Sequence, residues 1–326
     1  MSRQLLLVAS LTLAALYPRA AAAQAWVPPK GEGSVALLYQ DLFVKDHFFD
    51  RGQRRDRGEI NSQSLLLDLT YGVTDRLAIT FAVPYVRARY SGTAPHPTAQ
   101  DDGATHHGLQ DVRFSARFNV IDGPLTITPF VATSVPTHDY EYFAHAALGP
   151  HVPGVEVGAY VGRMLASALP NAFVQFRYSY GFGEKIVGIR PKRSNLDVEV
   201  GYFVTKTVRV FTLGSGRKAH GGIDVPEAGW RVLPPALGPH HDQIGRIDLL
   251  DVGAGVQASV TKSLDVFGSY MKSLAGRNTH AINRGITVGA SWSFGRGLRS
   301  MMQSAAAPSS SDEEGVRHLV KCLCQK

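Results

Sequence analysis

The segment RGITVGASWSF, residues 284–294, alternates apolar with small or polar side chains along most of its length. Ile286, Val288, Ala290, Trp292 and Phe294 occupy every second position, and Thr287, Gly289, Ser291 and Ser293 lie between them. Successive side chains of an extended strand point to opposite sides of a sheet. The segment is therefore predicted to be a β-strand with one apolar face and one small, polar face.

The same alternation recurs in segments of about ten residues along most of the chain. Strands are predicted to begin near Val35, Ile60, Leu77, Gly108, Leu125, Val155, Asn171, Asn195, Val208, Arg246, Leu264 and Arg284. An even number of strands with an apolar outer face and a polar inner face is typical of a bacterial membrane barrel. We therefore predict an all-β fold, a transmembrane antiparallel β-barrel of about twelve strands.

The joints between these strands alternate in length. Short polar turns are expected at 74–76, 122–124, 170–171, 205–207 and 261–263, and longer joints at 45–58, 92–107, 136–154, 184–194, 219–245 and 275–283. By the usual asymmetry of outer-membrane barrels, the short turns face the periplasm and the long loops face outward. A soluble β-sandwich is the alternative, but so many long hairpin-linked strands are unusual for that design.

The N-terminus has the features of a secretory signal peptide. Arg3 supplies a positive charge, an apolar run follows from Leu5 to Leu16, and Ala23-Gln24-Ala25 forms a small-x-small cleavage site. We expect a signal peptide at 1–25, a barrel at 26–295 and a flexible periplasmic tail at 296–326. An N-terminal anchor helix is the alternative, but the apolar run is too short to span a bilayer.

The composition limits the function classes. Charged residues make up 19% of the chain, the mean hydropathy is −0.06 and the formal net charge is +7. After the leader, no run of about 18 apolar residues exists that could form a transmembrane helix. The basic excess favours anionic partners, and export makes nucleic acid an improbable one. We expect the outer membrane of a Gram-negative cell, with its lipid, its lipopolysaccharide and the barrel-assembly machinery as partners.

Two stretches resemble a known family. Leu67 to Leu77, running on to Val83-Pro84-Tyr85-Val86, and then Gly108 to Val112, are similar to the outer-membrane barrel family named for the meta-pathway of phenol degradation. The resemblance covers most of the mature chain. It implies an outer-membrane transporter of small, often hydrophobic or aromatic, compounds, and it names no functional residues. The roughly 32 residues after Phe294 depart from the usual barrel ending at a terminal aromatic residue.

Strand alternation predicts a lumen lined by charges of both signs. The inward-facing candidates for the solute path are Asp68, Arg113, Arg117, Arg177, Asp197, Glu199, Arg209, Asp251 and Asp265. Such a lining could attract an anionic or carboxylated solute, because charged linings set pore selectivity. It could equally form a salt-bridge network that fills a narrow barrel, since twelve strands lie between filled and open barrels.

Eleven of the twelve histidines fall in the predicted external loops. The adjacent pairs His106-His107 and His240-His241 are candidate ligands for a transition metal, or groups that charge between about pH 5 and 8. At the C-terminus, His318, Cys322 and Cys324 could hold a soft ion such as Cu(I) or Zn(II). An incidental or oxidised cysteine pair is the alternative there. No other cofactor is expected.

Three functions remain after these observations. The first is a passive outer-membrane channel for small organic solutes, and we expect no enzymatic activity. The second is a non-conducting interaction protein whose His- and Arg-rich loops or C-terminal tail bind metal, lipopolysaccharide or a periplasmic partner. The third is an outer-membrane lipid hydrolase, for which His138 near Ser134 is the nearest approach to a catalytic pair.

Overall fold

The structure is a computed structural model that describes residues 25–93, 96, 99–165 and 169–295. Its strands are β1 (Gly33–Phe48), β2 (Arg54–Gly72), β3 (Leu77–Ser91), β4 (Thr105–Leu109), β5 (Val112–Phe118), β6 (Leu125–Val135), β7 (Gly154–Met164), β8 (Ala172–Gly183), β9 (Lys192–Phe203), β10 (Val208–Ala219), β11 (Asp248–Ser259), β12 (Leu264–Arg277) and β13 (Thr279–Phe294). Short helices η2 (Ala99–Asp101), η3 (Trp230–Val232), η4 (Gly238–His240) and α1 (His241–Ile244) lie in the loops.

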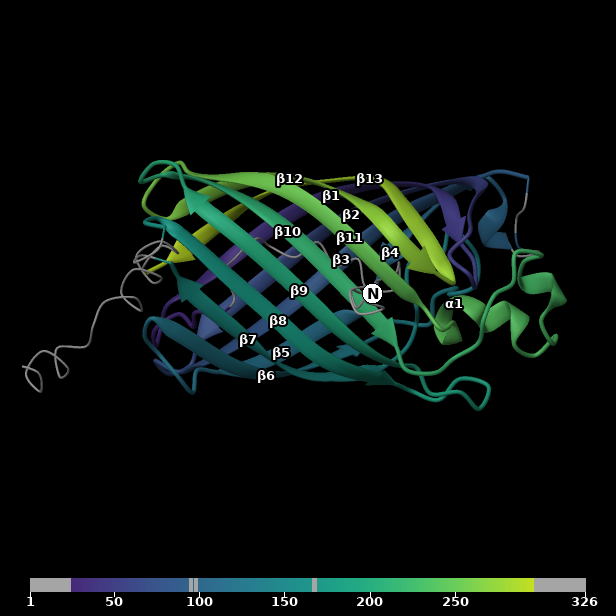
Figure 1. Cartoon of the computed structure of the whole chain (residues 1–326), viewed down its shortest axis with the longest axis horizontal. Coiled ribbons are helices and arrows are strands. Elements are labelled where there is room, and N and C mark those ends of the chain that lie inside the picture. Colours follow the sequence, from purple (N-terminus) through teal and green to yellow (C-terminus); the bar gives the residue numbers. More distant parts are fainter. Residues whose placement is uncertain (1–24, 94–95, 97–98, 166–168, 296–326) are drawn as a thin grey trace, which may run out of the picture.

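The sheet closes on itself. Every ladder is antiparallel, and Val35 in β1 lies opposite both Trp292 in β13 and Leu69 in β2. Both β4 and β5 pair with β3, so the thirteen strands occupy twelve positions around the wall (13 − 1 = 12). Closure leaves no free edge, so the backbone polar groups are paired within the protein. The predicted barrel is confirmed, and its strands are steeply tilted (Figure 1).

One predicted strand is interrupted. The strand expected from Gly108 consists of β4 and β5, separated by Gln110 and Asp111. Pro84 in β3 lies beside the break and has no N–H to give to the ladder, although its carbonyl accepts the N–H of Gln110 at 3.0 Å. The Asp111 carboxylate accepts a hydrogen bond from the Tyr140 hydroxyl in the loop that follows β6. At the break, therefore, the barrel wall is hydrogen-bonded to the loop that follows β6.

The outer face of the barrel is apolar. Leu37, Phe114 and Trp292 are 49%, 49% and 50% exposed, whereas Leu38, the residue after Leu37, is fully buried. Exposed aliphatic and aromatic side chains around a closed wall match the hydrocarbon of a bilayer. Among the described residues, no helix is long and apolar enough to cross a membrane.

Tight turns and long loops lie at opposite ends, here called the short-turn end and the long-loop end. Three short turns are stabilised by the same hydrogen bond. The hydroxyls of Thr74, Thr205 and Thr261 each accept a hydrogen bond from the backbone N–H of the residue three positions later, at 2.9, 2.9 and 3.0 Å. At the other end, α1 lies beside the mouth of the barrel (Figure 1), where its Asp242, Gln243 and Ile244 line a cavity together with residues of the inner wall.

The predicted alternation of short and long joints is confirmed only in part. The long joint predicted at 275–283 is wrong, because β12 and β13 extend past their alternating segments and only Asn278 separates them. Both strands stay paired at that rim, Arg277 with Asp248 and Thr279 with Phe48.

The first described residues lie inside the barrel. Ala25 and Trp26 are buried, and Trp26 packs edge-on against Phe173 at a centroid distance of 6.4 Å. The Thr128 hydroxyl in β6 donates to the Ala25 carbonyl at 2.6 Å. Because Phe173 begins β8 just after a short turn, these residues narrow the lumen toward the short-turn end.

Candidate functional site

A network of ion pairs lines the inner wall from β5 to β10. Glu156 in β7 lies at its centre, 2.5 Å from the guanidinium of Arg113 and 2.5 Å from that of Arg177. Arg177 also reaches the Asp197 carboxylate in β9 at 3.1 Å. The Asp197 carboxylate in turn accepts a hydrogen bond from Ser215 in β10. Neighbouring strands thus place charges of opposite sign side by side, which is why they coexist in a confined interior.

A second group lies nearer the short-turn end. Arg209 is 2% exposed and donates to Glu199 at 2.7 Å and to the Gln257 side chain at 2.8 and 3.1 Å. Its guanidinium also lies 5.2 Å from the ring centroids of both Phe173 and Phe211. Arg209 is therefore held by charge, hydrogen bonds and two aromatic faces at once.

The other predicted lumen residues also lie on the inward face but pair more simply. Arg117 donates to the Thr80 hydroxyl at 3.3 Å, and the Ser273 hydroxyl donates to Asp251 at 2.6 Å. Asp68 and Asp265 accept hydrogen bonds from Thr70 and Ser259 at 3.4 and 2.5 Å, respectively. Strand alternation thus identifies these inward positions, while their part in a solute path stays a prediction.

The opposite inner wall is richer in apolar side chains, although the inward Gln40, Ser64 and Asp68 also lie on it. Leu38, Leu66 and Phe267 form a buried cluster on β1, β2 and β12 with Ala36 and Ala82. A second cluster is made by Leu42, Val44, Ile60, Ala88, Tyr90, Ala146 and Ile282. The lumen therefore has one side rich in ion pairs and another side richer in apolar side chains. Strand alternation alone did not predict this division, although the run Leu65-Leu66-Leu67 is apolar on both faces of its strand.

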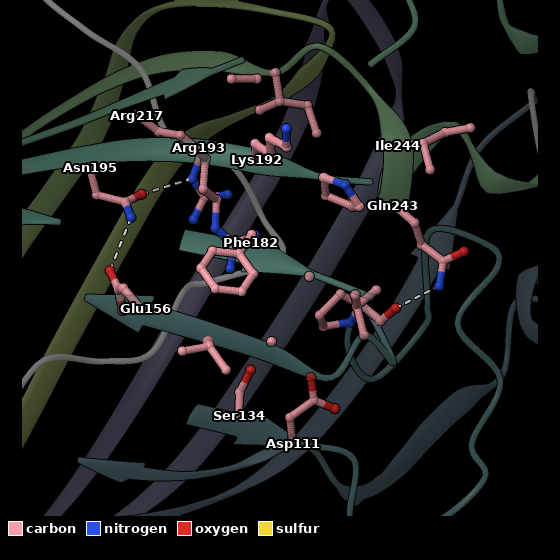
Figure 2. Close-up of a pocket in the computed structure, with 18 of the residues that line it drawn as sticks. Asp111, Ser134, Glu156, Phe182, Lys192, Arg193, Asn195, Arg217, Gln243 and Ile244 are labelled. Atoms are coloured by element: carbon pink, nitrogen blue, oxygen red, sulfur yellow. Dashed lines mark hydrogen bonds between the residues drawn. The ribbon is translucent and has the colours of Figure 1, made fainter. Parts of the chain in front are cut away.

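A cavity lies between the charged wall and the loops (Figure 2). Lys192, Arg193 and Arg217 line it together with Glu156. Asn195 joins two of them, since it accepts from Arg217 at 3.2 Å and donates to Glu156 at 3.1 Å. The predicted lumen residues did not include Glu156, Arg193 or Arg217. Glu156 had the same signal as the others, because it alternates with Val155 and Val157.

A second cavity lies against the opposite, more apolar wall. Leu42, Val44, Ile60 and Val86 line it on the barrel side. Pro150, Asp242, Gln243 and Ile247 border both cavities. The Gln243 side chain donates to the Pro150 carbonyl at 2.7 Å, so two long loops meet between the cavities. A solute entering here would meet cations on one side and an aliphatic surface on the other.

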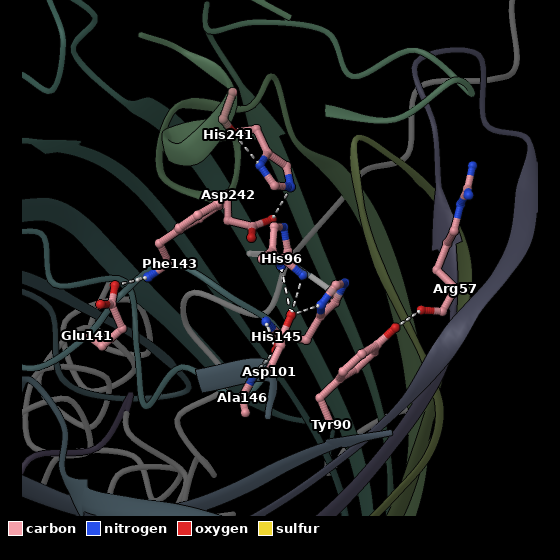
Figure 3. A network of polar contacts seen from close by, with 11 residues as sticks. Arg57, Tyr90, His96, Asp101, Glu141, Phe143, His145, Ala146, His241 and Asp242 are labelled. Carbon is pink, nitrogen blue, oxygen red and sulfur yellow. Dashed lines mark hydrogen bonds and ion pairs between the residues drawn. The ribbon is translucent and has the colours of Figure 1, made fainter. Parts of the chain in front are cut away.

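Histidines and aspartates of three long loops meet above these cavities (Figure 3). The Asp101 carboxylate contacts Nδ1 of His96 at 3.1 Å and Nδ1 of His145 at 2.8 Å. Burial raises the pKa of Asp101, but the hydrogen bonds from these imidazoles and from backbone N–H groups lower it more, so the pKa lies well below its usual range. Asp101 is thus held as a carboxylate that joins two loops.

The histidines singled out from sequence divide into different environments. His106 contacts Asp102 at 3.0 Å, while Nδ1 of His107 contacts the Tyr85 hydroxyl at 2.6 Å. His240 pairs with Gln243, but His241 is buried beside Asp242. Adjacent histidines therefore do not converge on one point in either pair. His96 and His145, by contrast, both contact the Asp101 carboxylate. They are far apart in the chain, so no local sequence pattern indicated that they meet.

His138 contacts the Thr137 hydroxyl at 2.9 Å, and Ser134 lines the charged cavity. Residues 1–24 of the predicted signal peptide, and the predicted tail with His318, Cys322 and Cys324, lie outside the described residues.

Comparison with known proteins supports the fold. No family model and no curated protein sequence matches the chain. An outer-membrane channel from Pseudomonas putida F1 superposes with a TM-score of 0.65 at 15% identity, covering 85% of this chain and 100% of that one. The translocator domain of the autotransporter NalP from Neisseria meningitidis gives 0.48 at 11% identity, covering 82% and 90%. The toluene transporter TodX of Pseudomonas putida gives 0.42 at 7%, covering 83% and 91%.

The likeness to the first of these structures, together with the apolar outer face and the closed ladder, gives the chain the fold of an outer-membrane β-barrel. That part of the expectation is confirmed. The resemblance to the phenol-degradation family and the nature of the solute stay predictions.

Proposed function

We propose that this protein is a passive outer-membrane channel for small organic solutes that combine an apolar body with an acidic group. The observation that carries the proposal is the division of the lumen into a charged and an apolar wall, with a cavity on each side. Aromatic carboxylates have this chemistry. The resemblance to a family of transporters of small, often hydrophobic or aromatic, compounds supports the apolar body of such a solute, and the cations of the wall support its acidic group.

The charged wall supports an anionic rather than a cationic solute. Arg113 and Arg177 both contact Glu156, and Arg177 also contacts Asp197, while Arg217 donates to the Asn195 side chain at 3.2 Å. Lys192 and Arg193 add positive charge at the cavity. An entering carboxylate would find guanidinium groups that bind it in a planar, bidentate way.

Swelling of proteoliposomes tests this proposal. We expect refolded mature protein to admit benzoate faster than the neutral sugar arabinose, because the cations attract the carboxylate and the apolar wall solvates the ring. Arg217→Gln should reduce the preference for benzoate severalfold, while Arg87→Gln, on the outer face of β3, should leave it unchanged. Equal rates for the two solutes in all variants would contradict the proposal.

A second function, the non-conducting interaction protein, is favoured by one observation. Trp26 fills the lumen toward the short-turn end, and the loops cover the long-loop end. If both obstructions are permanent, the barrel presents a surface rather than a path. Lipopolysaccharide or a periplasmic partner would then be its ligand. Folded protein that admits neither benzoate nor arabinose would favour this function.

A further inference from the structure

The loop cluster described above contains one nitrogen that the solute path does not explain. The His96 side chain is 1% exposed, and its Nε2 has no hydrogen-bond partner among the residues that the structure describes. A buried polar atom without a partner costs free energy, roughly 1–3 kcal/mol. Such an atom in a cluster of other possible ligands suggests that something occupies the site in the cell.

The side chains around His96 have the composition of a metal site. Ligand atoms of His96, His241 and Asp242 all lie within 4.8 Å of one another. His241 Nε2 and the Asp242 carboxylate are 3.4 Å apart. In a tetrahedral zinc site, metal–ligand distances of about 2.0–2.1 Å separate the ligands by about 3.3 Å. Small side-chain movements would therefore bring the three groups to coordination distance.

The outer contacts of both imidazoles favour this use. Nδ1 of His96 contacts the Asp101 carboxylate at 3.1 Å, and Nδ1 of His241 contacts the Gly238 carbonyl at 2.7 Å. Each Nδ1 therefore carries the proton, which leaves a lone pair on Nε2. Metal-binding histidines almost always donate their other ring N–H to a carboxylate or carbonyl in this way.

An alternative set of ligands, His96, Asp101 and His145, is also close enough to bind a metal. Its carboxylate is already saturated, because it accepts from both imidazoles and from the backbone N–H groups of His96 and His145 at 2.8 and 3.0 Å. The two Nδ1 atoms act as donors there and cannot also be ligands. Asp101 is therefore better explained as the group that orients His96.

The rings are also held in place by packing. Trp230 stacks on His96 at a centroid distance of 5.2 Å and on His241 at 6.2 Å, with an interplanar angle of 7° in the second case. His96 belongs to the loop between β3 and β4, while Trp230, His241 and Asp242 belong to the loop between β10 and β11 (Figure 3). An ion bound here would link two loops across the mouth of the barrel.

We propose that His96, His241 and Asp242 form a binding site for a divalent transition metal, with Zn²⁺ the ion that best fits two imidazoles and a carboxylate. A water molecule would complete the coordination. The bound ion would join the β3–β4 loop to the β10–β11 loop and so stabilise the arrangement of the loops at the long-loop end. This proposal does not depend on the solute path.

Metal titration of the full mature chain tests the site. Cys322→Ser and Cys324→Ser are introduced first, so that no thiolate of the C-terminal tail can bind the metal. We expect one equivalent of Zn²⁺ to bind by calorimetry, and Co²⁺ to give the absorption bands of a four-coordinate site. His241→Ala and Asp242→Asn should each weaken binding at least tenfold. His240→Ala is the matched control, because that adjacent imidazole pairs with Gln243 instead, and it should bind as the parent does.

Limited proteolysis gives a second readout that does not require conductance. Arg231 lies exposed in the β10–β11 loop, next to Trp230. We expect Zn²⁺ to slow tryptic cleavage after Arg231 in the parent and in His240→Ala, but not in His241→Ala. Folding of each variant is checked by its heat-modifiable migration on gels. Folded parent that takes up no metal, or His241→Ala that binds as tightly as the parent, would overturn the proposal.

Discussion

At the scale of single residues, the direction of a side chain was predictable but its partner was not. Alternation identified Arg177, Arg209 and Asp197 as inward-facing, because period two separates the two faces of a strand. Their pairing with Glu156 and Glu199 depends on the register between strands, which a single sequence does not contain. The loop histidines were harder still, since only the folded loops bring His96 beside His241.

Arg209 offers the sharpest test at this scale. Arg209→Met leaves the Glu199 carboxylate without its cation in a confined interior, and we expect a loss of about 3–5 kcal/mol in the free energy of unfolding. Adding Glu199→Gln to Arg209→Met should recover much of that loss, because the uncompensated charge disappears. Urea unfolding in lipid vesicles measures both. If the double variant is as unstable as the single one, packing against Phe173 and Phe211, rather than the ion pair, is the main role of Arg209.

At the scale of elements, strands and short turns followed from the sequence, while the breaks and long loops did not. Each predicted strand start falls in a strand of the barrel or within two residues of one, but β2 begins six residues before Ile60 and β13 begins five residues before Arg284. β2 extends beyond the alternating segment because Arg54–Asp56 pair with Asp46–Phe48 at the rim. The interruption at Gln110 and Asp111 depends on Pro84 and Tyr140, which lie in other segments of the chain.

The threonine turns allow a test of elements. Thr205→Ala removes an acceptor that serves the N–H groups of Thr207 and Val208 at 3.1 and 2.9 Å. Because this turn is exposed to water, we expect a loss of about 1 kcal/mol in the free energy of unfolding. Thr205→Ser keeps the hydroxyl and should lose much less. Equal losses in both variants would mean that the methyl group, and not the hydrogen bonds, stabilises the turn.

At the scale of the whole molecule, the closed barrel follows from alternation and an even strand count, whereas its two-sided interior does not. The apolar wall comes from inward residues such as Leu38 and Leu66, which look like ordinary members of an apolar run. Charged and apolar walls facing each other give the lumen a chemistry that neither wall has alone. The proposed channel function requires these two unlike walls and a lumen that is open to solutes.

Single-channel recording in a planar bilayer tests this central claim most directly. Refolded mature protein should give discrete conductance steps that prefer anions, and benzoate should reduce them more than acetate at equal concentration, because only benzoate also contacts the apolar wall. Acetate carries the same charge and so serves as the matched control. Heat-modifiable, correctly folded barrel that stays silent at every applied voltage would contradict the account and leave a binding protein in its place.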